Sequence, residues 1–186
     1  MPHIVQLMAD SPAFFLSIVF ILSLLVGSFL NVVIYRLPIM MEHSWKAEFE
    51  GYFNPEKPTE PQAKFNLIKP DSTCPKCQHK IRAWENIPVL SWLCLRGKCS
   101  HCKKPISIRY PMVELLTACL SLMVAWHFGF GPQAAAAIVL TWCLVAMTFI
   151  DLDKMLLPDQ ITLPLLWLGL LPVSYTHLTL PTTSRV

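Results

Sequence analysis

Residues 148–167 read TFIDLDKMLLPDQITLPLLW, and they place three carboxylates between two apolar segments. The carboxylates are Asp151, Asp153 and Asp159. The apolar run before them, Ala134 to Ile150, contains no charged residue and is just long enough to cross a bilayer as a helix. The pattern therefore indicates two membrane segments joined by a short polar connection.

The composition of the whole chain agrees with this interpretation. The 186 residues are 54% hydrophobic and 15% charged, which is too apolar for an ordinary soluble domain. Phe14–Tyr35 and Met112–Phe130 are long enough to span a membrane, whereas a fourth apolar segment after Gln160 reaches only about Val173. We predict an all-α polytopic membrane protein.

The distribution of basic residues predicts the orientation. Thirteen of the fifteen Lys and Arg residues lie between Arg36 and Arg109, while the turn GFGPQ, residues 129–133, has none. By the positive-inside rule the 36–110 loop is cytoplasmic, the N-terminus is periplasmic, and Asp151 returns to the cytoplasmic side. The net charge of +3 is then a topology signal, so no nucleic-acid partner is expected. The first segment is expected to be a retained anchor, because its flank carries Asp10 and no basic residue.

The first half of the loop contains a possible short amphipathic helix. Its sequence is MMEHSWKAEFEGYF, residues 40–53, and NPEKPTEPQ follows as a connector. Composition favours a surface element that packs on the membrane face over a contact site for a substrate or partner.

The second half of the loop contains two CxxC pairs, Cys74/Cys77 and Cys99/Cys102, with 21 residues between them. Two such pairs supply the four sulfurs of a tetrahedral zinc site. The separation is slightly longer than the usual value of about 15 to 20 residues. Disulfides are disfavoured in a cytoplasmic loop, and a thioredoxin-like redox motif would need a surrounding βαβ pattern. We predict structural Zn²⁺ held in a cytoplasmic zinc-binding loop domain.

The other histidines and cysteines near these pairs have simpler explanations. His79 and His101 lie beside the CxxC pairs and could replace a ligand, although solvated loop histidines are the favoured interpretation. Cys94, Cys119 and Cys143 occupy apolar segments and are expected to be packing residues.

A solvated loop explains Asp153 and Asp159 well, since LPDQIT resembles a helix start that Asp159 would cap. Asp151 is different, because it follows VAMTFI directly and should lie at the membrane interface, partly desolvated. Ionisable groups at membrane depth suggest function, and paired aspartates hydrolyse peptides when one activates water and the other polarises the carbonyl. From spacing alone both readings stay open.

Four motifs, in this order, resemble the bacterial type IV prepilin peptidases. They are GSFLNVVIYRLP (27–38), the pair CPKC and CSHC (74–77 and 99–102), ISIRYPMVELLTA (106–118) and FIDLDKMLLPDQITLPLLW (149–167), and the likeness covers about residues 14–173. The resemblance implies an aspartic endopeptidase of the bacterial inner membrane that cleaves the basic leader of type IV prepilins and type II secretion pseudopilins after Gly. It also implies N-methylation of the new N-terminal residue with S-adenosylmethionine.

The resemblance also implies roles for particular residues. The first catalytic aspartate of the family stands seven residues before the Pro of the LLPD element, which is Asp151 here; Asp153 and Asp159 become supporting residues. Gly97 matches a position important for methyl transfer, although a turn before the second CxxC pair would also explain it. The substrates, prepilins and pseudopilins, and membrane lipid are the implied partners.

One departure from the family changes the expectation for activity. The second catalytic aspartate of the family lies in a later G-x-G-D motif, and no such motif occurs here. The polar end SYTHLTLPTTSRV reads as non-native sequence, so we expect a C-terminally truncated chain that is inactive alone. The expected regions are 1–35 with the first span, the 36–110 loop, 111–173 with the later helices and the catalytic aspartate, and the tail 174–186.

Two other functions remain open on the residues alone. One is a zinc-stabilised membrane adaptor without catalysis, and the other is a transporter subunit that uses Asp151 as a proton site. A G-x-G-D segment in an intact version of the gene would separate the peptidase from both.

Overall fold

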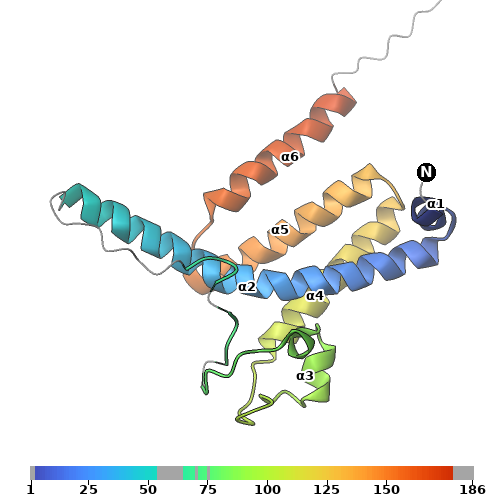
Figure 1. Ribbon diagram of the computed structural model, residues 1–186. Coiled ribbons are helices and arrows are strands. Elements are labelled where there is room, and N and C mark those ends of the chain that lie inside the picture. The colour runs from blue at the N-terminus through green and yellow to red at the C-terminus, as the bar shows by residue number, and fades with distance from the viewer. Residues whose placement is uncertain (1–2, 54–64, 70, 75, 178–186) are drawn as a thin grey trace, which may run out of the picture.

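The computed structural model describes residues 3–53, 65–69, 71–74 and 76–177, and this part of the chain is helical apart from its loops (Figure 1). Two isolated β-bridges, Thr73–Lys80 and Lys98–Pro105, are the only extended pairing in the described residues. The elements are α1 (His3–Asp10), α2 (Pro12–Phe53), η1 (Ala83–Asn86), α3 (Leu90–Cys94), α4 (Arg109–Phe128), α5 (Pro132–Lys154) and α6 (Asp159–His177).

Three of these helices, α2, α4 and α5, are long and apolar enough to cross a membrane. They correspond to the three full spans that the sequence predicts. The described residues therefore confirm the all-α polytopic membrane fold. The α4–α5 turn is made by Gly129, whose φ is +67°, and by Pro132, which begins α5 at a position where no backbone donor is needed.

The first membrane helix is longer than the sequence predicts. Instead of a span that ends at Tyr35 and a separate short helix, α2 continues through Pro38 to Phe53 as 42 residues. At 1.5 Å per residue it is about 63 Å long, roughly twice the ~30 Å hydrocarbon core. One end of α2 must therefore project beyond the bilayer.

The projecting half of α2 is the predicted amphipathic segment. Trp45, Phe49, Tyr52 and Phe53 are exposed there, and their spacing places them on one side of the helix. Helicity is thus confirmed, whereas packing on the membrane face stays a prediction. The connector at 54–62 lies outside the described residues.

The helices α2 and α4 approach each other closely at Gly27. A Cβ atom on Gly27 would lie 2.8 Å from the Cα of Glu114, so only glycine lets the two backbones meet here. Beside it the Ser28 hydroxyl bonds the Glu114 carboxylate, and Asn31 Nδ2 donates to the carbonyl oxygen of Tyr110 at 3.2 Å. The GSFLN motif is thus the surface on which α4 packs.

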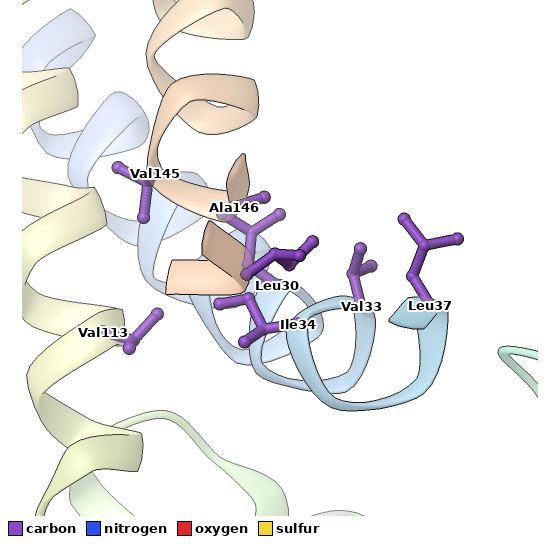
Figure 2. Packing of buried hydrophobic residues seen from close by; sticks show 8 residues of the cluster. Leu30, Val33, Ile34, Leu37, Val113, Val145 and Ala146 are labelled. Carbon is purple, nitrogen blue, oxygen red and sulfur yellow. The ribbon is translucent and has the colours of Figure 1, made fainter. Parts of the chain in front are cut away.

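A cluster of buried aliphatic residues joins α2, α4 and α5 (Figure 2). Its members are Leu30, Val33, Ile34, Leu37, Val113, Val145, Ala146 and Ile150. Ile150 and Val113 are completely buried. Because Ile150 immediately precedes Asp151, this cluster fixes the end of α5 that carries the aspartate.

The last helix, α6, stands away from the other helices and contacts the bundle mainly through α5 (Figure 1). It continues to His177, a few residues beyond the apolar segment that the sequence predicts to end near Val173. Residues 178–186 of the expected tail lie outside the described part of the chain.

Candidate active site and metal centre

The two CxxC pairs form the same local structure. In the first, Cys74 N–H donates to the His79 carbonyl at 2.9 Å and Gln78 N–H donates to the Cys74 carbonyl at 2.8 Å. In the second, the Cys99 N–H donates to the Lys104 carbonyl at 2.9 Å, and the Lys103 N–H donates to the Cys99 carbonyl at 3.1 Å. Each turn is a tight knuckle that turns two sulfur atoms to one side.

The knuckles also share their backbone conformation. The residue four places after the first cysteine, Gln78 or Lys103, has a positive φ of 56° or 55°. The β-bridges Thr73–Lys80 and Lys98–Pro105 close both knuckles at equivalent positions. Such repeated geometry is what a site built from two half-sites requires.

The four sulfur atoms come together as a cluster. The Sγ atoms of Cys74, Cys77, Cys99 and Cys102 all lie within 4.8 Å of one another. The distance from Cys74 Sγ to Cys102 Sγ is 3.9 Å, far too long for a disulfide. Sulfurs around a tetrahedral ion with bonds of ~2.3 Å are about 3.8 Å apart, so the cluster fits such an ion.

The backbone already favours one thiolate in this cluster. Hydrogen bonds from the N–H groups of Lys76 and Cys77 lower the pKa of Cys74 to about 6. The N–H of His79 lowers the pKa of Cys77, but burial and the thiols of Cys102, Cys74 and Cys99 outweigh it and raise that pKa to about 11. Four crowded thiols cannot all ionise without a cation, which a bound metal ion would supply.

The neighbouring histidines are not part of the sulfur cluster. His79 and His101 stack on each other with ring centroids 5.3 Å apart and an angle of 16°. His79 Nε2 also lies 3.8 Å from Glu85 Oε2. The two rings pack against each other across the two knuckles, where His79 is half-buried and His101 is exposed, as expected for a solvated loop histidine.

The loop domain that carries the four cysteines contacts the membrane bundle through Glu114. This buried carboxylate on α4 accepts the backbone N–H of Val89 at 2.7 Å, just before α3. Val89 has a φ of 57°, which is strained for a β-branched residue. The contact holds the loop in a conformation that it would otherwise avoid.

Gly97 lies in the turn that leads into the second knuckle. Its φ is +66°, and a Cβ atom there would lie 2.9 Å from Cζ2 of Trp92. Its carbonyl oxygen accepts the N–H of Ile106 at 2.7 Å. The positive φ and the close Trp92 ring therefore explain why the turn needs glycine at position 97.

Asp151 lies in the last turn of α5, not in a loop as its sequence context suggests. Its backbone carbonyl accepts the N–H of Met155 at 2.8 Å, and Met155 ends the helix in the left-handed conformation. The side chain is exposed, and within the described residues no hydrogen bond or ion pair engages it. Packing against the protein therefore does not desolvate it, and only the surrounding membrane interface could.

The two residues that follow Leu152 are both paired. Asp153 binds the Arg109 guanidinium at the start of α4 through two hydrogen bonds, of 2.8 and 2.6 Å. Lys154 Nζ lies 2.8 Å from Glu42 Oε1 on the projecting part of α2. Among Asp151, Asp153 and Lys154, only Asp151 has a charged group that no described residue pairs with.

Asp159 is the first residue of α6, but the expectation that it caps this helix is not what the backbone shows. The carbonyl oxygen of Pro158 accepts the N–H groups of Ile161 and Thr162 at 3.0 and 3.1 Å. Pro158 therefore occupies the cap position, and Asp159 is an acidic residue in the first turn.

Sequence reasoning missed the partners of these acidic residues. Arg109 entered the prediction only as a topology signal, and Glu42 and Lys154 were not singled out. The contacts join residues 44 and 112 positions apart in the chain. No local pattern reveals such pairs, although the Glu in a membrane segment, Glu114, could have been noticed as an unusual charge.

These features define a class of protein: a polytopic helical membrane protein with a four-cysteine cluster that could hold a metal ion between its first two spans and a free aspartate at the end of the third. Family comparison is consistent with this class. The family described as Bacterial Peptidase A24 N-terminal domain matches residues 21–128, and the Type IV leader peptidase family matches residues 138–184. The chain belongs to the type IV prepilin peptidase family.

Several proteins named Prepilin leader peptidase/N-methyltransferase are similar to this chain. The protein from Aeromonas hydrophila is 58% identical over 171 residues, which are 92% of this chain and 59% of that protein. The one from Pseudomonas aeruginosa is 57% identical over 88% of this chain and 56% of its own length. The protein from Neisseria gonorrhoeae is 53% identical over 81% of this chain and 53% of its own length.

The chain thus spans about three fifths of the length of the curated relatives that it matches. No solved structure matches the chain.

Proposed function

We propose that this chain carries the first catalytic aspartate of a bifunctional prepilin-processing enzyme. The enzyme would cleave the leader of type IV prepilins and pseudopilins after Gly and then methylate the new N-terminus. The observation that carries the proposal is the free, exposed carboxylate of Asp151 at the end of a membrane helix, in a chain of the prepilin peptidase family.

Peptide hydrolysis by two aspartates needs one ionised and one protonated carboxyl group. The ionised group takes a proton from water while the water oxygen attacks the scissile carbonyl carbon. The protonated group donates its proton to the carbonyl oxygen. The tetrahedral intermediate then collapses: the group that took the proton of water passes it to the leaving nitrogen, the C–N bond breaks, and the second group takes its proton back. Asp151 would be one of this pair, and the aspartate of the family's G-x-G-D motif the other.

The neighbouring aspartates are poor substitutes for that second group. Asp153 already accepts hydrogen bonds from Arg109 through both of its carboxylate oxygens, so its carboxylate is engaged in a bidentate ion pair. Asp159 is separated from Asp151 only by the short turn that joins α5 to α6. We keep both as supporting residues.

The four-cysteine cluster supports a structural zinc ion. The described sulfur positions fit a closed tetrahedral site, and a closed site leaves no open position for water or substrate. Bound zinc would fix the two knuckles together and so hold the loop domain in its fold. The hydrogen bond from the Val89 N–H to the Glu114 carboxylate would then keep the folded loop domain attached to the membrane bundle.

Methyl transfer would use S-adenosylmethionine and take place in the loop domain. This part of the proposal depends on the family resemblance. Gly97 would contribute by keeping the Trp92 indole against the turn before the second knuckle. The loop is proposed to face the cytoplasm of a bacterium and the N-terminus the periplasm, with the chain in the inner membrane.

Cleavage of a prepilin tests this function. The chain would be compared with a version that carries the family's G-x-G-D segment, each in membrane vesicles with a prepilin and S-adenosylmethionine. We expect the extended version to remove the leader after Gly and add one methyl group, as read by mass spectrometry. We expect the 186-residue chain alone to leave the prepilin uncut, because one aspartate cannot be both acid and base in one step.

Two results would contradict the proposal. Cleavage by the 186-residue chain alone would remove the need for a second aspartate. No cleavage by an extended version that binds its metal ion and inserts normally would favour the adaptor or transporter alternative.

A further inference from the structure

The end of α5 is held from one side by Arg109. This residue begins α4 and reaches across to α5, where its two guanidinium nitrogens bond both oxygens of Asp153. The same guanidinium carbon lies 5.4 Å from the ring centroid of Phe149. Arg109 therefore contacts two residues of α5: it forms two hydrogen bonds with Asp153 and a cation–π contact with Phe149.

The geometry of this grip is more restrictive than that of an ordinary surface pair. A bidentate arginine–carboxylate contact fixes the relative orientation of both groups. Phe149 and Asp153 are four residues apart, so they lie on the same face of the helix. Together they set the rotation of α5 about its own axis as well as its distance from α4.

The rotation of α5 about its axis determines the direction in which the Asp151 side chain points. With 3.6 residues per turn, a residue two places before Asp153 points about 200° away around the helix. The carboxylate of Asp151 is consequently presented on the side opposite to Arg109, where no described side chain engages it. A second tie, from Lys154 to Glu42 of α2, limits movement of the same turn in another direction.

We propose that Arg109 and Asp153 form a positioning pair that orients Asp151 for peptide cleavage. This inference rests on the proposed peptidase function. Its physical basis is that partly exposed ion pairs contribute little to stability, whereas a displacement of about 1 Å at a reacting group lowers the rate about 10²-fold. The pair should therefore matter for turnover far more than for folding.

The test uses the G-x-G-D-containing enzyme in membrane vesicles with Arg109→Gln and Asp153→Asn, singly and together. We expect each single variant to lower kcat for leader cleavage about 10- to 100-fold with little change in KM, and the double variant to lose no more than the worse single one. Arg109→Lys keeps the positive charge but not the planar guanidinium that bonds both oxygens of Asp153, so it should restore only part of the rate.

Methylation of a pilin that has already been cut is the internal control. Because methyl transfer is proposed to take place in the loop domain and not at Asp151, its rate should stay unchanged in the same preparations. A general loss of folding would lower both activities together. Asp71→Asn, which breaks the exposed Lys80–Asp71 pair of 2.6 Å, is the matched control and should leave cleavage unchanged.

A readout without catalysis keeps the two proposals separate. A spin label on Asp151→Cys, with the thiols outside the sulfur cluster replaced, should become more mobile when Arg109→Gln is added, because the helix turn that carries the label is then less restrained. Unchanged label mobility, normal kcat in both single variants, or an equal loss of cleavage and methylation would each overturn the positioning role. If the unmodified enzyme cuts no prepilin, the peptidase proposal fails, and the label alone decides whether the pair orients position 151.

Discussion

A side chain at position 97 would collide with the indole of Trp92. The backbone there has a φ of +66°, and the added Cβ atom would lie 2.9 and 3.0 Å from two carbons of the ring. A left-handed conformation costs a non-glycine residue about 1–2 kcal/mol before any collision is counted. Gly97→Ala should therefore displace the turn that leads into the second knuckle.

The prediction for Gly97→Ala is a combined loss of metal retention and methyl transfer. Trp92→Ala should recover part of both, because it removes the steric component. Gly51→Ala is the control, since nothing lies within 4 Å of a Cβ atom there. Metal content and methylation are measured on the same samples. Loss of methylation with normal metal content would instead give Gly97 a direct role in chemistry.

At the residue scale the sequence identified the candidate groups but not their contacts. Asp151 and the four cysteines stand out by position and spacing, because an apolar run and a CxxC repeat are local patterns. What distinguishes Asp153 from Asp151 is Arg109, which lies 44 positions away in the chain. Only the packing of α4 against α5 brings that partner into reach.

At the scale of single elements, the four-cysteine domain should depend on pH through its ligands. The pKa of Cys74 is lowered to about 6, and that of Cys77 is raised to about 11. At neutral pH, Cys74 is therefore mostly ionised, whereas Cys77 must release its proton when a metal ion binds. Zinc affinity should fall as the pH falls, and more steeply below about pH 6, where Cys74 also becomes protonated.

Competition with a chelator over a pH series measures this affinity in the 186-residue chain. The 186-residue chain is preferable to a 36–110 fragment, because α2 runs unbroken through residue 36 to Phe53. Cys99→Ser should abolish binding of one zinc ion per chain, while Cys94→Ser, outside the cluster, should not. A metal-free chain whose loop domain folds normally would refute the structural zinc ion.

The contact between α2 and α4 makes a second prediction at this scale. In Gly27→Ala the new Cβ atom would meet backbone atoms of Glu114 at 2.8 and 3.2 Å, and backbone cannot move aside as a flexible side chain can. We expect the free energy of unfolding to fall by about 1–3 kcal/mol, as for other overpacked sites. Gly169→Ala in α6 is the control, with nothing within 4 Å. Equal stability of the two variants would contradict the close contact.

The helices themselves were predicted well from the sequence and their ends less well. Apolar runs of suitable length gave α2, α4 and α5 as spans, because burial in lipid demands such runs. The continuation of α2 through Pro38 was missed, since proline usually ends or kinks a helix. Likewise α5 keeps Asp151 and Asp153 within its last turn, where charge alone suggests a loop.

At the scale of the whole molecule, topology decides whether Asp151 can meet a cytoplasmic substrate. Reporter fusions at residue 131 should report the periplasm, and fusions at residues 60 and 155 the cytoplasm. The physical reason is the concentration of Lys and Arg between Arg36 and Arg109. A cytoplasmic signal at residue 131 would reverse the orientation and move Asp151 away from the proposed cleavage site.

The most direct test of the account is leader cleavage by Asp151→Asn in the enzyme that carries the G-x-G-D segment. Asparagine keeps the shape of the side chain but cannot take up the proton of water. Cleavage of a prepilin should be lost, while the metal content and the methylation of an already cut pilin stay normal. Full cleavage by Asp151→Asn would show that this aspartate is not the catalytic group.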